Sequence, residues 1–288
     1  MEQKIILVTG ATGGLGKETA IQLARQGHRV IVHGRNRQKT EAVAKEIAET
    51  NGSKTVDIAV SDLGSFAEIK KMAEELKANY DHIDVLINNA GAQFWERELT
   101  TDGHEKTMQT NVFAPFLLSY LLLPLLGKAE EGRVVTVSSA SHKAGGNAQL
   151  DNLEFAENYS LTSSYGLSKR YIIWVMRHFV DFARGQGYGN ITFNVSHPAS
   201  TMSELGRDVI KKSLLWKIIM YLWSKFMLIP VEKAAYGSVW LATSDEVKGQ
   251  NNRYVCPKEP EKPSEKNYTK ENEQRVWDYC MEVTKDYR

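Results

Sequence analysis

Cysteine is scarce in this sequence. Cys256 and Cys280 are the only two among 288 residues, and they form neither a CxxC pair nor a plausible zinc site. So little cysteine fits a reducing compartment, and we expect a cytoplasmic protein. The 36 basic residues almost equal the 35 acidic ones, and the net charge of +1 leaves no electrostatic footprint for a nucleic acid.

Long hydrophobic runs are also missing. No stretch reaches about 18 uninterrupted apolar residues, so we do not expect a membrane-spanning helix. The first residues lack the basic and apolar regions of a signal peptide. Hydrophobic residues still make up 42% of the chain and charged residues 25%, which excludes general disorder. Without repeats or an interdomain linker, residues 1–288 are predicted to form a single domain.

Apolar segments of strand length alternate with amphipathic segments of helix length. Strands this apolar are buried on both faces, and regular alternation with helices is typical of βαβ units. The sequence therefore predicts an α/β protein with a doubly wound parallel sheet, covered by helices on both faces. The expected strands are 4–9, 29–33, 55–60, 83–88, 133–138 and 190–196, and the expected helices are 17–26, 39–49, 65–79, 108–126 with Pro115 near a bend, and 164–182.

Two later segments depart from this alternation. Residues 203–230 are hydrophobic but not strand-like, and 257–270 are rich in proline and charge, which indicates a surface loop. The stretch 271–284 looks helical again. We treat 257–288 as a C-terminal extension of the domain.

A glycine-rich turn follows the first strand and opens the first helix. Its glycines, Gly10, Gly14 and Gly16, are spaced GxxxGxG. A pyrophosphate must approach such a backbone closely, and the helix amino terminus supplies free N–H groups and the positive end of a dipole. Glycine also occurs in plain tight turns, but the first βα junction of an alternating chain favours a dinucleotide site.

The end of the second strand indicates which dinucleotide binds. An NAD site places a carboxylate there for the ribose hydroxyls, whereas this chain has no acid before Glu41. Arg35 offers a planar fork for a 2′-phosphate, and Lys17 and Arg37 add positive charge. The sequence favours NADP(H), although these residues could instead be solvated surface cations.

Two pairs of residues are candidates for the catalytic chemistry, a tyrosine with a lysine and two adjacent serines. Tyr165 and Lys169 are four residues apart, on one face of a helix, and a cation beside a phenol lowers its pKa toward the working range. Ser138 and Ser139 end the fifth strand, where ligands meet a parallel sheet. Either serine could hold a substrate carbonyl, and either could be a turn residue.

Taken together, these motifs resemble the short-chain dehydrogenase/reductase family. The glycine turn, Asn88-Asn89-Ala90-Gly91, Asn111, Ser138-Ser139 and Tyr165-xxx-Lys169 occur in the family's order. The resemblance implies a single Rossmann domain and hydride transfer between a nicotinamide and a carbonyl or alcohol carbon. It covers essentially the whole chain.

The resemblance also assigns roles residue by residue. It implies Tyr165 as the general acid–base, Lys169 as the group that lowers the pKa of Tyr165 and holds the nicotinamide ribose, Ser139 as the group that orients the substrate oxygen, and Asn111 as the support of a water-linked proton relay. Asp62 would contact the adenine ring, and Asn88 would tie the central strands. The full set of expected cofactor-binding residues is Gly10, Thr12, Gly14, Leu15, Gly16, Arg35, Asp62, Leu63, Asn89, Ala90, Gly91, Tyr165, Lys169, Pro198 and Ser203.

Several stretches are similar to the retinol dehydrogenase-like branch of the family, including residues 14–20, 137–142, 196–198 and 272–283. This branch also carries an insertion between its serine and tyrosine. Pro198 is followed by alanine where the family has glycine, and Ser203 replaces a threonine. The membrane-anchoring segment of many animal members is not seen ahead of the first strand.

The apolar stretch 213–229 has only four residues outside the hydrophobic set. The resemblance places a substrate lid here, within 203–230, and a lid this apolar implies a bulky hydrophobic substrate. A subunit-packing helix of a homo-oligomer or a helix on a membrane surface is the alternative.

No metal is expected, because the remaining histidines show no ligand spacing, and His142 is interpreted as a loop residue near the cleft. The sequence thus predicts an NADP(H)-dependent oxidoreductase acting on a small hydrophobic carbonyl or alcohol. The alternatives are a non-catalytic NADP-binding scaffold or sensor, and a C=C reductase resembling the light-dependent protochlorophyllide reductases.

Overall fold

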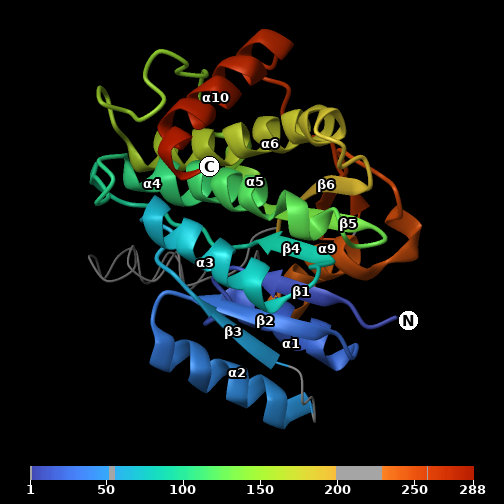
Figure 1. The fold of residues 1–288 in the computed structure, drawn as a ribbon. Coiled ribbons are helices and arrows are strands. Elements are labelled where there is room, and N and C mark those ends of the chain that lie inside the picture. The colour runs from blue at the N-terminus through green and yellow to red at the C-terminus, as the bar shows by residue number, and fades with distance from the viewer. Residues whose placement is uncertain (1, 52–55, 199–228, 258) are drawn as a thin grey trace.

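The computed structural model describes residues 2–51, 56–198, 229–257 and 259–288. One sheet of eight strands runs through it, in the order β3-β2-β1-β4-β5-β6-β7-β8 (Figure 1). All neighbouring strands are parallel except β7 and β8. The strands are β1 (Ile5–Val8), β2 (Arg29–Gly34), β3 (Val56–Val60), β4 (Val85–Asn88), β5 (Gly132–Val137), β6 (Ile191–Ser196), β7 (Tyr254–Cys256) and β8 (Glu259–Pro260).

Helices cover both faces of this sheet. In Figure 1, α3, α5, α6 and α10 lie on one side, and α1 and α2 lie on the other. The α-helices are α1 (Gly14–Arg25), α2 (Arg37–Asn51), α3 (Phe66–Asn79), α4 (Lys106–Met108), α5 (Ala114–Leu126), α6 (Leu161–Gly185), α9 (Val231–Thr243) and α10 (Lys270–Val283). Shorter turns are the π-helix η1 (Gln109–Phe113) and the 3₁₀ helices η2 (Ala140–Lys143), η4 (Asp245–Val247) and η5 (Lys285–Tyr287).

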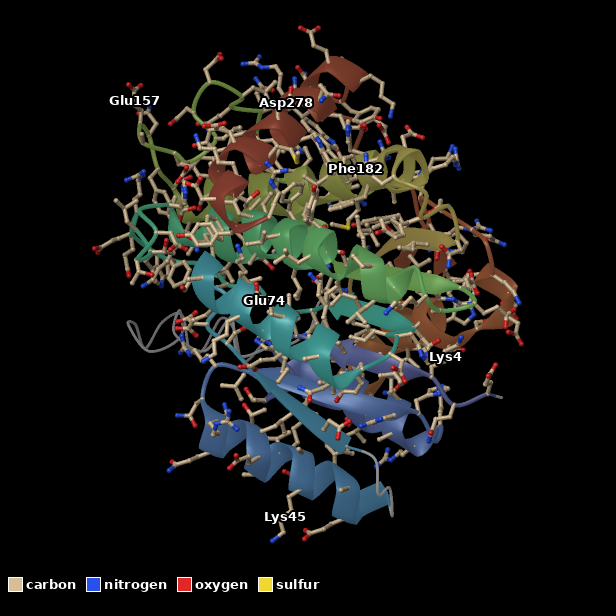
Figure 2. The ribbon with its side chains drawn as sticks, viewed as in Figure 1. Lys4, Lys45, Glu74, Glu157, Phe182 and Asp278 are labelled. Atoms are coloured by element: carbon tan, nitrogen blue, oxygen red, sulfur yellow. The ribbon has the colours of Figure 1, made fainter. Side chains whose placement is uncertain are left out.

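The alternation of side chains along each strand builds two separate cores. Leu7 of β1 packs with α3, α5 and α6, whereas its neighbours Ile6 and Val8 pack with α1, α2 and α9. On α2, Ile47 is buried against the sheet while Lys45 is exposed on the outer side (Figure 2). This is the predicted doubly wound parallel sheet, a Rossmann fold.

The strand order reverses at β1, which lies between β2 and β4. Ligands of open α/β sheets bind outside the carboxyl ends of the strands at such a reversal. The predicted phosphate turn follows β1 at this position, so the fold places it where a dinucleotide site belongs.

Three elements differ from the prediction. The proline-rich stretch 257–270 was expected to be only a loop, but Glu259–Pro260 forms the edge strand β8 against β7. Neither β7 nor α9 was predicted. β7 is short and α9 is weakly patterned in sequence. In the structure β7 pairs with β6, and α9 packs on α1.

The predicted long helix 108–126 is present within one helical stretch, Lys106–Leu126, which contains a π-helical turn. The π-helical turn, Gln109–Phe113, lies between α4 and α5, and Pro115 follows it in the first turn of α5. The stretch Lys106–Leu126 is long and apolar enough to cross a membrane, but 83% of its most apolar window is buried inside the protein, as in a core helix.

The C-terminal helix α10 packs on α6. Trp277 contacts the rings of Phe116 and Phe179 edge-on, at centroid distances of 5.0 and 4.8 Å. The expected lid, 203–230, lies outside the described residues except for Ile229 and Pro230, and Ser203 lies outside them too.

Candidate active site

The turn after β1 is shaped for close approach. Gly10 has a φ of +62°, and a β-carbon there would lie 3.0 Å from the Cα of Ala90. A β-carbon on Gly16 would lie 2.3 Å from Nδ2 of Asn89 and 2.5 Å from the carbonyl oxygen of Gly10. Helix α1 has no side-chain cap at Gly13. Its open amino terminus therefore suits an anion, as the sequence predicts.

The neighbouring turn after β4 is tied to the phosphate turn by Thr9. The Thr9 hydroxyl oxygen accepts from the backbone N–H groups of Asn89 and Ala90, both at 3.0 Å. The Asn89 amide donates to the Thr9 carbonyl at 2.8 Å. Thr9 was not among the predicted site residues, although it stands directly before Gly10. Only the pairing of β1 with β4 reveals its role.

Asn88 joins the central elements as expected. Its buried amide donates to Ser119 Oγ of α5 at 3.0 Å and to Thr136 Oγ1 of β5 at 3.4 Å. These bonds hold β4, β5 and α5 together beneath the site.

At the end of β2, Arg35 is exposed and stands next to the phosphate turn, because Thr12 packs against Gly34. The other two expected cations form ion pairs with carboxylates of α2. Lys17 pairs with Glu46 at 2.6 Å, and Arg37 pairs with Glu41 at 3.5 Å. Glu41 is one helical turn from Arg37 on α2, whereas Glu46 is distant in sequence from Lys17, and no local pattern reveals that pair.

His33 supports the phosphate turn from below, a role that sequence reasoning missed. The backbone N–H of Gly10 donates to His33 Nδ1 at 3.2 Å, so Nε2 carries the proton and points to Ser61, with its carbonyl at 3.2 Å. Burial lowers the pKa of His33 to about 4, which keeps the ring neutral. The ring thus connects β2, the phosphate turn and the end of β3.

Two expected adenine-side residues follow β3. Asp62 is exposed, and its Oδ1 accepts from the N–H of Gly64 at 2.8 Å. Leu63 is only 9% exposed and its side chain belongs to the core. Leu63 can therefore meet a cofactor only through its backbone.

Tyr165 and Lys169 lie one helical turn apart on α6. Lys169 is buried, its ammonium donates to the Val137 carbonyl at 3.0 Å, and it lies 5.9 Å from the centre of the Tyr165 ring. Burial lowers the pKa of Lys169 to about 8.

The pKa of Tyr165 differs in direction from the expectation. Burial raises it, and a hydrogen bond with Ser139 offsets this only in part. The Lys169 ammonium donates to a backbone carbonyl, and burial disfavours its own charge.

The two serines at the end of β5 have different surroundings. Ser138 is buried and its hydroxyl donates to the Lys169 carbonyl at 2.8 Å, so it is a structural residue. Ser139 faces the Tyr165 hydroxyl and also accepts from the N–H of Ser141 at 3.2 Å. Ser139 is therefore the serine available to a substrate oxygen.

Asn111 lies in the π-helical turn. Its amide donates to the Ala92 carbonyl at 2.8 Å and to Ser168 Oγ at 3.0 Å, and its Oδ1 accepts from the Ala92 N–H at 2.8 Å. A β-carbon on Gly91 would lie 3.0 Å from Lys169 Nζ and 3.2 Å from Asn111 Oδ1. Glycine at 91 thus lets both polar groups face one spot, as a relay through water would need.

Pro198 is partly exposed and follows the carboxyl end of β6. The preceding residue, His197, donates its backbone N–H to the Val255 carbonyl of β7 at 2.9 Å. Pro198 is thus held at the same edge of the sheet as the serines.

His197, Cys256 and Glu261 bring ligand-type atoms within 4.8 Å of one another, which no spacing in the sequence reveals. Two features weigh against a metal there. The Lys143 ammonium lies 3.5 Å from the Glu261 carboxylate. With a metal on Nε2 of His197, Nδ1 would carry the proton, and Nδ1 is buried with no partner among the described residues. We propose no metal site.

Comparison with known proteins agrees with this geometry. Residues 4–151 match the model of the short chain dehydrogenase family. Retinol dehydrogenase 12 of Mus musculus is 31% identical over 97% of this chain and 86% of its own length. Polyprenol dehydrogenase of Homo sapiens is 30% identical over 98% of this chain and 85% of its own length.

Solved structures show the same fold. An uncharacterised protein from Mycobacterium paratuberculosis has a TM-score of 0.77 and 26% identity, covering 98% of this chain and 94% of its own. A Shigella flexneri 2a protein described as a short chain dehydrogenase, complexed with NADP, has a TM-score of 0.68 and 25% identity, covering 89% and 98%.

The fold and the site thus define a Rossmann-type oxidoreductase with a place for a nicotinamide dinucleotide. This chain belongs to the short chain dehydrogenase family, and within it the chain is similar to the retinol dehydrogenases.

Proposed function

We propose that the protein is an NADP(H)-dependent oxidoreductase that interconverts a hydrophobic carbonyl compound and its alcohol. The observation that carries the proposal is the grouping of Tyr165, Ser139 and Lys169 at the carboxyl ends of the strands. They lie at the same edge of the sheet as the open phosphate turn. The nicotinamide, when bound, supplies or accepts the hydride.

The protein's own residues handle the proton. The Tyr165 phenol keeps its proton at neutral pH because burial raises its pKa, so it suits the role of general acid toward a carbonyl oxygen. Ser139 orients that oxygen. Lys169 holds the cofactor's ribose, and Asn111 beside Gly91 supports the path that returns a proton to the site.

NADP(H) is favoured over NAD(H) by Arg35. It is exposed at the end of β2, where an NAD site would place an acid, and among the described residues no carboxylate pairs with it. The Shigella flexneri relative was crystallised with NADP, which supports a phosphorylated cofactor.

A hydrophobic substrate is favoured by the relatives and by composition. Two similar proteins are named for retinol and polyprenol, both long apolar alcohols. The stretch 213–229 of this chain is almost wholly apolar.

The role of 213–229 as a lid stays a prediction, as do a cytoplasmic location, a homo-oligomer and membrane contact. Fractionation of cells and sedimentation would test these directly.

The test is a panel of apolar aldehydes and ketones assayed by NADPH oxidation, with wild type and Tyr165→Phe. The variant should bind NADPH as before and lose turnover by about 100-fold or more, the usual scale of general acid catalysis. Tyr236→Phe, partly exposed on α9, is the matched control. A wild type that binds NADPH but reduces no carbonyl would overturn the proposal and favour the scaffold. Reduction of conjugated C=C bonds alone would favour the C=C reductase.

A further inference from the structure

His142 was expected to be a loop residue near the cleft, but it is fully buried behind the catalytic serine. It lies in η2, three residues after Ser139. It contacts Tyr254 of β7 and Ser264 of the C-terminal extension, which is called the C-terminal segment below. The ring packs edge-on against Tyr254, at a centroid distance of 5.3 Å. Both ring nitrogens are hydrogen-bonded, as is usual for a buried polar side chain.

The hydrogen bonds define which nitrogen carries the proton. The backbone N–H of Ser264 donates to His142 Nε2 at 2.9 Å, so Nε2 is the acceptor. Nδ1 therefore bears the hydrogen and donates to the carbonyl oxygen of Ser139 at 2.7 Å. The backbone N–H of His142 donates to the same carbonyl at 3.0 Å. Two donors from one residue thus hold the Ser139 backbone.

A second branch reaches Lys169. The Tyr254 hydroxyl oxygen lies 3.1 Å from His142 Nδ1, where it can share the Nδ1 hydrogen as a second acceptor, and the hydroxyl adjoins Ser138. Ser138 in turn donates to the Lys169 carbonyl at 2.8 Å. The next residue, Arg170, links α6 back to His142. Its Nε and Nη2 donate to the His142 carbonyl at 3.0 and 2.8 Å.

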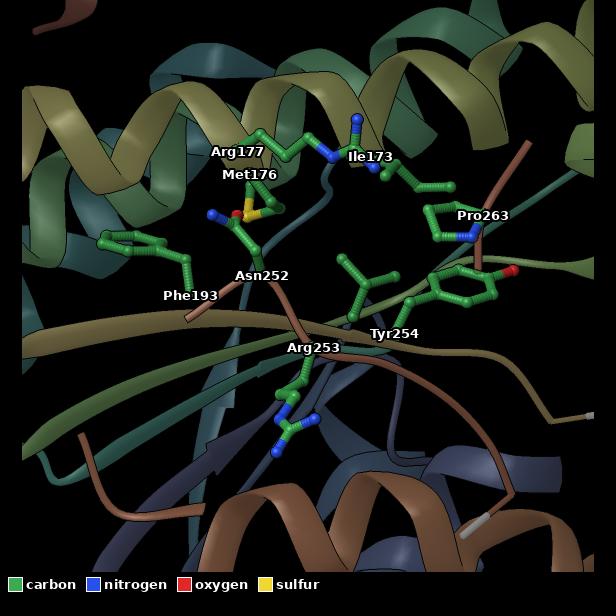
Figure 3. Close-up of a pocket in the computed structure, with 9 residues that line it drawn as sticks. Ile173, Met176, Arg177, Phe193, Asn252, Arg253, Tyr254 and Pro263 are labelled. Atoms are coloured by element: carbon green, nitrogen blue, oxygen red, sulfur yellow. The ribbon is translucent and has the colours of Figure 1, made fainter. Parts of the chain in front are cut away.

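The C-terminal segment that supplies Ser264 is itself anchored. Pro263 and Tyr254 line a small cavity beneath α6, shown in Figure 3 with Arg177 at its rim. Arg177 pairs with Glu265 at 2.6 Å and covers the Tyr268 ring at 4.6 Å. The segment therefore presents the Ser264 N–H from a well-supported position.

We propose that His142 is a positioning residue for Ser139 and, through Tyr254 and Ser138, for the α6 backbone at Lys169, with the C-terminal segment setting its tautomer through Ser264. The inference rests on the proposed function. His142 touches neither reacting atoms nor cofactor. It acts by fixing the distance between Ser139, which follows β5, and the Tyr165–Lys169 turn of α6.

The kinetic test compares two variants that differ in one hydrogen bond. His142→Phe removes the donor to Ser139, whereas the amide of His142→Asn reaches the position of Nδ1 and keeps it. Since a misplacement of about 1 Å can cost 100-fold in rate, kcat should fall about 10- to 100-fold in His142→Phe and recover to within about threefold of wild type in His142→Asn. The dissociation constant for NADPH should stay unchanged in both.

His178→Phe is the matched control, because His178 is partly buried on α6 and bonds to Glu273 at 3.2 Å, away from the serine. It should lower the melting temperature without lowering kcat. Equal kcat in His142→Phe and wild type, or equal losses in the Phe and Asn variants, would overturn the proposal.

A measurement without turnover separates this inference from the proposed function. In wild type with ¹⁵N-labelled histidine, NMR should show His142 as the Nδ1–H tautomer at neutral pH. Hydrogen exchange of peptides spanning 137–143 and 165–172 should speed up in His142→Phe and not in His142→Asn. An Nε2–H tautomer, or unchanged exchange, would refute the positioning role even in an active enzyme. The expected NMR and exchange results in a protein that reduces no carbonyl would refute only the proposed function.

Discussion

The ammonium of Lys169 donates a hydrogen bond to the Val137 carbonyl across 3.0 Å, and this contact joins α6 to the end of β5. It brings together the helix that carries Tyr165 and the strand that leads to Ser139. Burial lowers the pKa of Lys169 to about 8, so this lysine can gain or lose its charge near neutral pH. Burial shifts the pKa of the neighbouring Tyr165 in the opposite direction and raises it.

The first prediction follows from these two pKa values. Carbonyl reduction needs a protonated Tyr165, which its raised pKa preserves, and a charged Lys169, which is lost above about pH 8. We therefore expect kcat/KM for carbonyl reduction to fall as the pH rises through about 8. NADPH binding should weaken over the same range, since the ammonium holds the ribose. A flat profile up to about pH 10 would show that the Lys169 charge is not needed.

The second prediction concerns cofactor choice. Arg35→Asp replaces the phosphate-binding fork with a carboxylate, and hydrogen bonds to charged groups are worth about 1.5–3 kcal/mol. The preference for NADPH over NADH, measured as a ratio of dissociation constants, should fall at least about 10-fold. Lys45→Asp makes the same charge change on the exposed face of α2 and should leave the ratio alone. An unchanged ratio in Arg35→Asp would make this arginine a surface cation.

The third prediction concerns the phosphate turn. A methyl group at Gly16 would lie 2.3 Å from Asn89 Nδ2 and 2.5 Å from the Gly10 carbonyl, so the turn must shift. Gly16→Ala should weaken NADPH binding by about 10-fold or more, read by fluorescence titration. Gly185→Ala, which meets open space at the end of α6, is the control and should bind as wild type does. Equal affinities for all three proteins would contradict the assignment.

The fourth prediction concerns stability in acid. The pKa of His33 is about 4 in the folded protein and 6.5 as the ordinary value, so the unfolded chain binds the proton first as the pH falls. The stabilisation is complete above about pH 6.5 and is lost as the pH falls toward about 4. At about pH 5 the loss amounts to roughly 2 kcal/mol in the free energy of unfolding, relative to neutral pH.

Urea unfolding of wild type and His33→Asn at about pH 7 and pH 5 checks this. Because the variant carries the same other histidines, wild type should lose roughly 2 kcal/mol more than the variant on acidification. Parallel losses in the two proteins would mean that His33 takes up its proton in the folded state.

Much of the fold could be predicted because its signals are local. The strands β1 to β6 are short apolar runs, and the helices between them, apart from the almost wholly apolar α5, have one apolar face, so these patterns can be recognised without tertiary contacts. The elements that were missed, β7, β8 and α9, are short or depend on neighbours. Glu259–Pro260 is a strand only because β7 lies beside it.

The candidate site divides in the same way. The glycine turn and the Tyr165–Lys169 pair are encoded by spacing within one segment, and the structure places them as expected. Thr9, His33 and His142 were missed or misjudged because their partners are distant in sequence: Asn89, Gly10 and Ser264. The pairing of Lys17 with Glu46 was hidden for the same reason.

By itself, then, the sequence determined the order of β1 to β6 with the helices between them, the family, and the residues proposed to carry the chemistry, since these depend on periodicity and short spacing. Only the tertiary structure decided the protonation and support of those residues. Burial raises the pKa of Tyr165 and lowers that of Lys169, and a buried histidine holds Ser139 from behind. Burial and long-range hydrogen bonds are properties of packed chains, and no local pattern specifies them.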